Sequence, residues 1–237
     1  MSELLTQRTA EWLEARRGKL TASNMGAILG LVSSVSQITA LKRALGTDSF
    51  NGNAATEWGN NNEANGVAAY EQLTGMKVEL TGLHTHKDCE FIAGSPDGLV
   101  GEEGLIEIKC PFYFPWNGAG RIHTKVPLHY YVQMNVLLEI TQRQWCDYVC
   151  WTPEGVSIFR VYRDTACFEQ CLPYFHIFFR AMQCNDANSL RAYSAERARL
   201  KDVISSSMLK HVHFQMRIDT KLQKAYPDRD PFEDVDD

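Results

Sequence analysis

The sequence lacks any long hydrophobic run. Nowhere in its 237 residues do about 20 apolar residues follow one another, the length that a helix needs to cross a bilayer. Residues 1–20 read as a charged amphipathic segment without the apolar stretch of a secretory signal. We therefore expect a cytoplasmic protein with no membrane partner.

An even, paired set of cysteines is also missing. The chain has seven cysteines, and without a secretion signal we expect reduced thiols instead of disulfides. Cys146 and Cys150 lie in an expected strand, roughly 13 Å apart, which is too far to share one zinc ion. Cys167 and Cys171 can face each other on a helix, but two thiols make only half a site. Buried apolar cysteine is the ordinary interpretation there, and a structural metal or iron–sulfur cluster is the minor alternative.

An excess of basic residues is absent as well. The net charge is −5, and residues 227–237 carry six acidic residues and one arginine, so the rest of the chain is balanced at 23 basic and 23 acidic residues. A nucleic-acid partner would have to be bound by a local basic cluster. We expect the acidic tail, residues 227–237, to be disordered.

Internal repeats and low-complexity linkers are lacking too, and 44% hydrophobic residues can bury one large core. We expect a single domain over residues 1–226 with an α/β fold, a mixed β-sheet flanked by helices. Periodicity predicts helices at residues 9–17, from Thr21 or Ser23, and at 36–45, 54–73, 127–140, from Thr165 and about 189–225. Strands are expected within residues 77–86, 89–94, 105–110, 144–151 and 156–163, the first three forming a meander. The parts are N-terminal helices (6–45), a central α/β core (about 54–163) and C-terminal helices (about 165–225).

Two carboxylates and an ammonium are present on adjacent strand segments. Glu107 and Lys109 stand two apart, so on a strand both project from one face while Ile106 and Ile108 pack on the other. An isolated pair of this kind usually belongs to a half-exposed sheet face. Asp97, however, lies at a turn ten residues earlier and can fold back beside Glu107, where the two carboxylates would repel each other unless a cation lay between them. Such hard oxygen ligands suit Mg²⁺ or Mn²⁺.

These motifs resemble those of the PD-(D/E)XK nucleases, and within them the lambda exonuclease branch, also called YqaJ-like phage recombinases. The matching residues cover residues 12 to about 160 in one order: Trp12, Arg16-Arg17-Gly18, Thr21-Ala22-Ser23, Trp58-Gly59, Glu63, Ser95-Pro96-Asp97-Gly98-Leu99, Glu107-Ile108-Lys109-Cys110-Pro111-Phe112, Tyr130, Gln133 and Thr141. The resemblance implies a restriction-endonuclease-like core, with the central part as its catalytic core.

The resemblance also implies roles for five of these residues. Asp97 and Glu107 hold magnesium with the backbone carbonyl of Ile108, and Lys109 activates or orients the attacking water. Whether Lys109 is a base stays open, because burial and a cation lower its pKa while the two carboxylates raise it. Glu63 contributes to a second metal position, which is the weaker assignment.

Gln133 matches the family glutamine on a helix behind the sheet, where it orients Lys109 or the water. The plain alternative is a buried polar group that only satisfies backbone partners. For Glu63, the plain alternative is a solvated helix charge.

The resemblance places the 5′-terminal phosphate at Arg16 and Ser23. A guanidinium offers a fork of donors, and Thr21 to Ser23 open a helix whose amides face an anion. Arg17 either contacts the DNA backbone or is a solvated surface charge. Apolar residues at 31–32, 112, 114 and 116 either wedge the duplex open or pack in a core or subunit contact. His84 and His86 lack a third ligand and are expected to be ordinary exposed histidines on a strand.

The expected function is that of a magnesium-dependent exonuclease. It would degrade the 5′-ended strand of linear double-stranded DNA to mononucleotides, leaving 3′ single-stranded tails for phage-type recombination in the cytoplasm of a bacterial host. The resemblance also implies a homotrimeric ring and a single-strand annealing protein as partner. The alternatives are an endonuclease on the same core that cuts internally, and a non-catalytic DNA-end-binding module.

Overall fold

A six-stranded mixed sheet forms the centre of the protein. The computed structural model describes residues 5–47, 52–112, 121–190 and 194–219. The strand order is β2-β5-β6-β7-β8-β9, and all neighbours are antiparallel except β6 and β7, which are parallel. The strands are β2 (Val78–Glu79), β5 (Gly98–Val100), β6 (Gly104–Lys109), β7 (Trp145–Thr152), β8 (Gly155–Tyr162) and β9 (Val212–Asp219).

A second, smaller sheet was not expected. It has the order β1-β4-β3, with β1 (Leu20–Thr21) parallel and β3 (His84–Thr85) antiparallel to β4 (Ile92–Gly94). The mixed α/β fold is therefore as predicted, but the meander is wrong. The chain leaves the small sheet after Gly94 and enters the main sheet at Gly98, so the Ser-Pro-Asp segment between them bridges two sheets.

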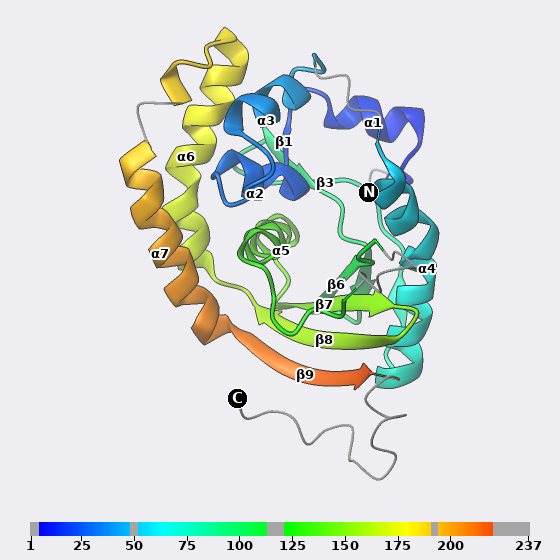
Figure 1. Ribbon diagram of the computed structural model, residues 1–237. Coiled ribbons are helices and arrows are strands. Elements are labelled where there is room, and N and C mark those ends of the chain that lie inside the picture. The colour runs from blue at the N-terminus through cyan, green and yellow to red at the C-terminus, as the bar shows by residue number, and fades with distance from the viewer. Residues whose placement is uncertain (1–4, 48–51, 113–120, 191–193, 220–237) are drawn as a thin grey trace.

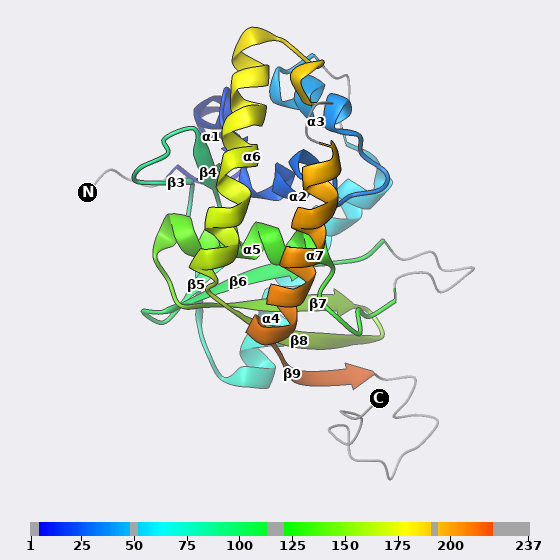
Figure 2. The same ribbon diagram turned by 90° about the vertical axis from the view of Figure 1, so that its left-hand side faces the viewer.

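Helices cover both faces of the main sheet (Figures 1 and 2). Helix α4 (Ala54–Thr74) packs on one face through Tyr70 against Ile106, Ile108 and Val149. On the other face lies α5 (Leu128–Thr141), seen end-on in Figure 1, whose residues 131–140 are all buried. A helix that is buried all round is a central core helix, so α5 holds the main sheet and the N-terminal elements together.

The remaining helices are α1 (Ala10–Arg16), the short η1 (Ala22–Asn24), α2 (Met25–Ile28), α3 (Gln37–Ala44), α6 (Thr165–Cys184) and α7 (Ser194–His211). Of these, α2 and α3 lie beyond α5 from the main sheet, and α6 and α7 run along its side (Figure 1). None of the helices in the described chain is long and apolar enough to cross a membrane.

The expected helix over residues 189–225 is wrong in its second half. After α7 the chain becomes strand β9, which pairs with β8 at the edge of the main sheet. The alternation of Val212, Phe214 and Met216 suits a strand, and Phe214 packs edge-on against Phe159 at 5.4 Å between ring centroids. Pairing with the open edge of β8 therefore makes residues 212–219 a strand and not a continuation of the helix. The acidic tail lies outside the described residues.

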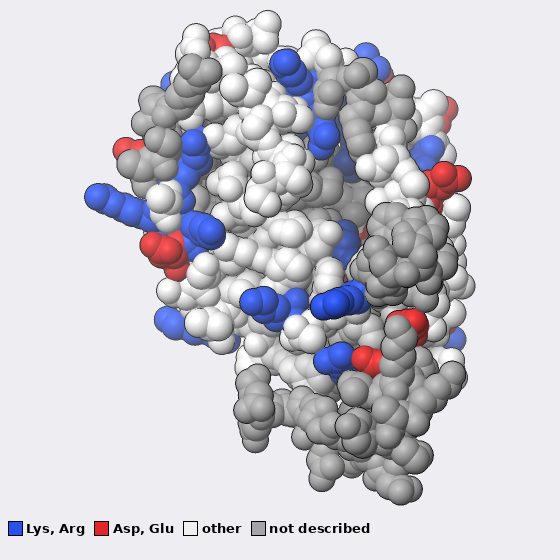
Figure 3. All heavy atoms as spheres, in the orientation of Figure 1, with Lys and Arg blue, Asp and Glu red and all other residues white. Residues whose placement is uncertain are grey.

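Charge is unevenly spread over the surface. On the face shown in Figure 3, the charged side chains near the centre are mostly Lys and Arg, while the acidic ones lie toward the margins. Lys and Arg side chains are thus present near the centre of this face (Figure 3) although the whole chain has a net charge of −5.

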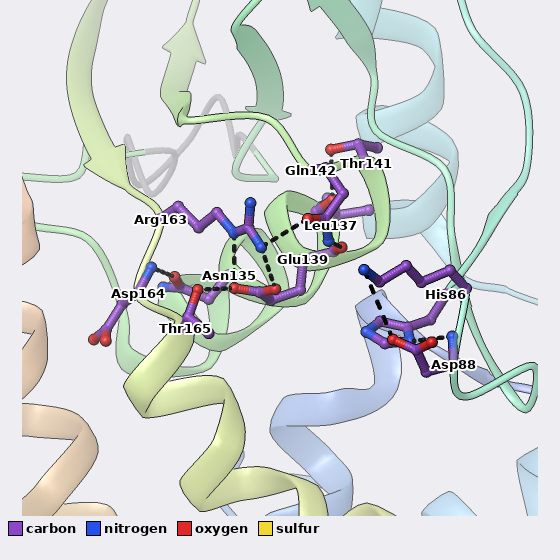
Figure 4. Close-up of polar contacts among 11 residues, drawn as sticks. His86, Asp88, Asn135, Leu137, Glu139, Thr141, Gln142, Arg163, Asp164 and Thr165 are labelled. Carbon is purple, nitrogen blue, oxygen red and sulfur yellow. Dashed lines mark hydrogen bonds and ion pairs between the residues drawn. The ribbon is translucent and has the colours of Figure 1, made fainter.

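A buried polar cluster fixes the position of α5 (Figure 4). Arg163 donates two hydrogen bonds to Glu139, from Nε to Oε1 at 2.8 Å and from Nη2 to Oε2 at 2.7 Å. Thr165 donates to Glu139 Oε1 at 2.5 Å, and the backbone N–H of Asp164 donates to Asn135 Oδ1 at 2.8 Å. The cluster joins α5 to the connection between β8 and α6.

Candidate active site

Asp97 and Glu107 come together because β5 and β6 are adjacent antiparallel strands. Gly98 pairs with Ile106, so Asp97, one residue before β5, lies beside the middle of β6. Its Oδ2 accepts a hydrogen bond from the backbone N–H of Ile108 at 2.6 Å. Burial raises the pKa of Asp97 well above its usual range, and the nearby carboxylate of Glu107 raises it further, although Lys109 and the Ile108 amide oppose this. Two carboxylates thus share a small buried space.

Glu107 has one saturated carboxylate oxygen and one without a partner. Its Oε1 accepts from Lys109 Nζ at 2.5 Å and from Gln133 Nε2 at 2.5 Å. Its Oε2 is buried and has no hydrogen-bond partner among the described residues. A buried carboxylate oxygen without a donor is costly, so Oε2 is suited to a cation.

Lys109 points to the same space from the α5-facing side of β6. Its side chain is 22% exposed, and Nζ lies 4.9 Å from the centre of the Tyr130 ring. Burial alone would lower the pKa of Lys109, but Glu107 and Asp97 outweigh burial and raise it above its usual value. Ile106 and Ile108 pack on the α4 side, as the alternation predicted.

Asp97 and Lys109 line a pocket of about 340 Å³ between α4 and β6. Its wall includes Glu63, Asp97, Ile108, Lys109, His123 and Tyr130. Glu63 reaches the pocket from α4, but its Oε2 is ion-paired with Arg8 Nη2. In the described part of the chain, no group of three His, Cys, Asp and Glu side chains lies close enough to hold a metal ion. The structure therefore brings Asp97 and Glu107 together but does not add Glu63 to them.

The chemistry of this pocket fits one divalent cation. Magnesium takes oxygen ligands and is commonly held by one or two carboxylates, with water and substrate phosphate completing its shell. Asp97 and Glu107 provide two such carboxylates, and the free Oε2 of Glu107 supplies an acceptor that no protein donor uses. The carbonyl of Ile108 was expected as a third ligand, and Ile108 also lines the pocket.

Gln133 lies where the resemblance placed it, on the face of α5 toward β6. It is 7% exposed and donates to Glu107. The sequence left open whether Gln133 orients Lys109 or water, or satisfies backbone groups. The structure shows a third arrangement, in which Gln133 and Lys109 share one oxygen of Glu107.

Arg16 is the last residue of α1 and packs on an aromatic ring. Its guanidinium carbon lies 4.1 Å from the centre of the Trp12 ring, and Trp12 Nε1 donates to Ser95 Oγ at 2.9 Å. Burial lowers the pKa of Arg16 to about 10. Since Ser95 precedes Asp97 by two residues, this chain of contacts ties Arg16 to the carboxylate loop.

Ser23 and Arg17 are less constrained. Ser23 is exposed in η1, with its Oγ 3.4 Å from Thr21 Oγ1. The helix expected to open here is a three-residue turn of η1 followed by the four-residue α2. Arg17 is exposed and pairs with Glu14 at 3.1 Å.

Two residues near the site were not singled out from the sequence. His123 lines the pocket, with Nδ1 2.6 Å from the hydroxyl of Tyr148. Arg8 holds Glu63 from a segment that is 55 residues earlier in the chain. Neither carries a local sequence signal, because both reach the site only through tertiary contacts.

Other residues that the sequence raised are placed as follows. Phe112 packs edge-on against Trp58 at 6.2 Å between ring centroids, and Leu31 packs against the core, while Phe114 and Trp116 lie outside the described residues. His84 bonds to Thr81, but His86 lies after β3 and is only 7% exposed, its Nδ1 accepting from two backbone amides. The expected exposed strand position of His86 is therefore wrong. Cys146, Cys150, Cys167 and Cys171 are buried free cysteines.

Several known proteins are similar to this chain in sequence. The YqaJ-like viral recombinase domain matches residues 11–144. Uncharacterized protein R354 of Acanthamoeba polyphaga mimivirus is 29% identical over 156 residues, 60% of this chain, and the chain spans only 28% of that relative's length.

Solved structures agree with the family match. The alkaline exonuclease LHK-Exo of Laribacter hongkongensis is 31% identical, with a TM-score of 0.61 over 81% of this chain and 100% of that one. LHK-Exo in complex with dAMP gives 29% identity and a TM-score of 0.63 over the same shares. A phage-related exonuclease of Haemophilus somnus 129PT, 15% identical with a TM-score of 0.50 over 75% of this chain and 96% of that one, shares the fold.

The fold is thus that of PD-(D/E)XK-type exonucleases, and the similarity to LHK-Exo supports a nuclease role. The family match covers more than half of the chain, including Asp97, Glu107, Lys109 and Gln133. The chain belongs to the YqaJ-like viral recombinase family.

Proposed function

We propose that this chain is a divalent-metal-dependent exonuclease that degrades the 5′-ended strand of linear double-stranded DNA. It releases mononucleotides and leaves 3′ single-stranded tails for phage-type recombination. The observation that carries the proposal is the unpartnered, buried Oε2 of Glu107, whose carboxylate acts on Asp97 next to a pocket that Asp97 and Lys109 line. The dAMP bound to the similar LHK-Exo supports a mononucleotide product.

Asp97 and Glu107 are the residues that would hold Mg²⁺ or Mn²⁺. When bound, the ion supplies a nucleophilic water near neutral pH and neutralises charge on the reacting phosphate. Gln133 and Lys109 donate to Glu107 Oε1, which leaves Oε2 as the oxygen that would be available to hold the ion. Lys109, fixed between Glu107 and the Tyr130 ring, holds its ammonium at the pocket, where it orients water or pairs with a phosphate oxygen.

The polarity of degradation follows from the end of the substrate that the protein grips. Arg16 and Ser23 are proposed to hold the 5′-terminal phosphate, with Arg17 on the DNA backbone. The half-buried guanidinium of Arg16, tied to the Asp97 loop through Trp12 and Ser95, supports this placement. We further propose a homotrimeric ring around the DNA and a single-strand annealing protein as partner, in the cytoplasm of a bacterial host.

The test uses three substrates with Mg²⁺. These are a linear duplex with 5′-phosphates, the same duplex with 5′-hydroxyls, and a closed circle. We expect mononucleotides from the 5′-phosphorylated duplex, an intact circle and no reaction in EDTA. Nicking of the circle would identify an internally cutting endonuclease, and binding without cleavage would identify a non-catalytic module.

Lys109→Met is the matched active-site variant. It should abolish hydrolysis while leaving DNA binding largely intact, because it removes only the ammonium from the pocket. Lys77→Met is the control, since Lys77 pairs with Glu71 near the C-terminal end of α4, away from Glu63 in the middle of the helix. Turnover like that of the wild type in Lys109→Met would remove Lys109 from the mechanism.

A further inference from the structure

Arg8 has a backbone conformation that arginine disfavours. Its φ is +69°, in the left-handed region. The two other non-glycine residues with positive φ in the described chain, Gln142 and Asn185, directly follow helices α5 and α6, where this conformation ends a helix. Arg8 instead precedes Thr9, the residue that caps the start of α1. No helix end accounts for its conformation.

The residues on both sides of Arg8 are tied down. The side chain of Gln7 donates to the carbonyl oxygens of Thr81 at 3.3 Å and Pro96 at 2.8 Å. Thr9 Oγ1 donates to the carbonyl oxygen of Thr6 at 3.0 Å and accepts from Trp12 N at 3.2 Å. Residues 6–9 are therefore fixed against the residue that precedes Asp97, and the direction of the Arg8 side chain is set by the fold.

The guanidinium of Arg8 is aimed at the proposed active site. It is ion-paired with Glu63, and both residues line a second hollow of about 340 Å³. That hollow shares Glu63 and Asp97 with the pocket that contains Lys109. Arg8 thus places a permanent positive charge at the border between the two hollows.

Stability does not account for this pair. The side chains of Arg8 and Glu63 are 48% and 29% exposed, and ion pairs this exposed contribute little to folding. The free-energy cost of a left-handed backbone conformation at an arginine exceeds the stabilisation that an exposed ion pair contributes. Strained residues that persist in this way cluster at functional sites.

We propose that Arg8 occupies Glu63 as a built-in cation and so weakens a second divalent-ion site. The chain then binds one divalent ion tightly, at Asp97 and Glu107. A second ion at Glu63 has to compete with the guanidinium and binds more weakly. This inference rests on the proposed metal-dependent function and deepens it, because it assigns Arg8 as a positioning residue that sets the number of bound ions.

The test is a Mn²⁺ titration of the full chain followed by electron paramagnetic resonance, which counts free Mn²⁺ and needs no DNA. The wild type should bind one Mn²⁺ per chain tightly. In Arg8→Gly, which tolerates a φ of +69°, the second site should tighten at least about tenfold, since a neighbouring positive charge is removed.

Three further variants separate charge from structure. Arg8→Lys keeps the charge and should bind as the wild type does. Lys77→Ala, which removes the cation paired with Glu71 elsewhere on α4, should also change nothing. Combining Arg8→Gly with Glu63→Gln should abolish the gain at the second site.

The inference is overturned if Arg8→Gly leaves the second site unchanged, or if the wild type already binds two Mn²⁺ ions equally. Asp97→Asn separates this result from failure of the proposed function. Loss of tight Mn²⁺ binding in Asp97→Asn with no effect of Arg8→Gly rejects the role of Arg8 alone. If Asp97→Asn leaves tight binding unaltered, the metal site itself is wrong and the role of Arg8 falls with it.

Discussion

The two oxygens of Glu107 show how single residues prepare this site. Oε1 is saturated by Lys109 and Gln133, whereas Oε2 is buried without a donor. The same strand buries Ile106 and Ile108 on its other face. Alternate residues of β6 therefore serve the polar site and the apolar core. A carboxylate held in this way is prepared for a cation by its neighbours.

Substitution of Gln133 tests whether its hydrogen bond to Glu107 prepares the carboxylate for a cation. In Gln133→Leu, Glu107 Oε1 keeps only Lys109 as a donor, and we expect activity with Mg²⁺ to fall about 10- to 100-fold, as for other groups that orient a metal ligand. The loss should appear in kcat and in Mn²⁺ affinity, and KM for DNA should change little. Gln133→Glu should be worse, because it adds a third carboxylate. Equal activity of Gln133→Leu and the wild type would reject the role.

Arg16 is also a single-residue feature, but its proposed role is to bind the 5′-terminal phosphate and not to position Glu107. Arg16→Ala should reduce the preference for 5′-phosphorylated over 5′-hydroxyl ends, because it removes a donor fork that lies away from Glu107. Initial rates on the two duplexes give the preference directly. If both rates fall by the same factor, Arg16 is a general backbone contact.

At the scale of elements, the site depends on how closely α4 approaches β6. Gly66 of α4 is buried, and a Cβ there would lie 2.6 Å from Ile108 Cγ2. Ile108 lies between Glu107 and Lys109, so the packing of α4 sets the position of both. Gly59, on the same helix, has open space at the position of a Cβ.

This contrast predicts opposite effects of one substitution at two positions of α4. Gly66→Ala should lower the free energy of unfolding by about 1–3 kcal/mol through overpacking, even though alanine favours the helix. Gly59→Ala should raise it by up to about 1 kcal/mol. Urea unfolding measures both. A stabilised Gly66→Ala would mean that α4 and β6 can separate freely.

The polar cluster of α5 makes a pH-dependent contribution. Burial alone would raise the pKa of Glu139, but the hydrogen bonds from Arg163 and Thr165 outweigh burial and lower it. The folded pKa is therefore below the unfolded value of about 4.3, so the charged pair stabilises the fold above that pH. This stability is lost as the pH falls through the folded pKa.

Arg163→Met should expose this dependence. It leaves Glu139 buried without its cation and should cost about 3 kcal/mol at pH 7. The deficit should shrink as the pH falls through the lowered folded pKa of Glu139, below which Glu139 is protonated in both proteins. Urea unfolding at several pH values provides the measurement. A deficit that does not change with pH would show that Arg163 acts through packing alone.

At the scale of the whole molecule, the C-terminal elements α7 and β9 complete the hydrophobic core and the edge of the main sheet. Helix α7 buries Leu200 and Ile204 in the core, and β9 covers the edge of β8. The family match ends at residue 144, before β7, so half of the main sheet lies beyond it. The main sheet therefore needs more of the chain than the residues that carry the family motifs.

Truncation after residue 193 tests this dependence. It removes two buried side chains worth about 2–3 kcal/mol each and opens the edge of β8. That sum is comparable to the whole stability of many domains, so we expect a fragment that aggregates or unfolds without a cooperative transition. Circular dichroism during urea unfolding measures it. A cooperative transition at the full-length midpoint would show that α7 and β9 are dispensable.

Local signals in the sequence determined the elements that hold the site. Alternation along residues 105–110 was enough to place Glu107 and Lys109 on one face, and periodicity over residues 54–73 gave the bounds of α4 to within one residue. The same signals placed α5 and, through the resemblance, the glutamine that reaches Glu107. These features depend on residues close together in the chain, where propensity and periodicity act.

Only the tertiary structure decided which elements meet. The bridge between two sheets at Pro96, the strand β9 and the ion pair of Arg8 with Glu63 all depend on contacts between distant parts of the chain. Which segment pairs with an open strand edge or packs on a helix face is decided when the chain folds into its tertiary structure. The sequence of a short segment alone does not show which partner it will meet. Arg8 shows the limit most clearly, since its side chain pairs with Glu63, 55 residues away, and the preceding Gln7 is held by Pro96, 89 residues from Gln7.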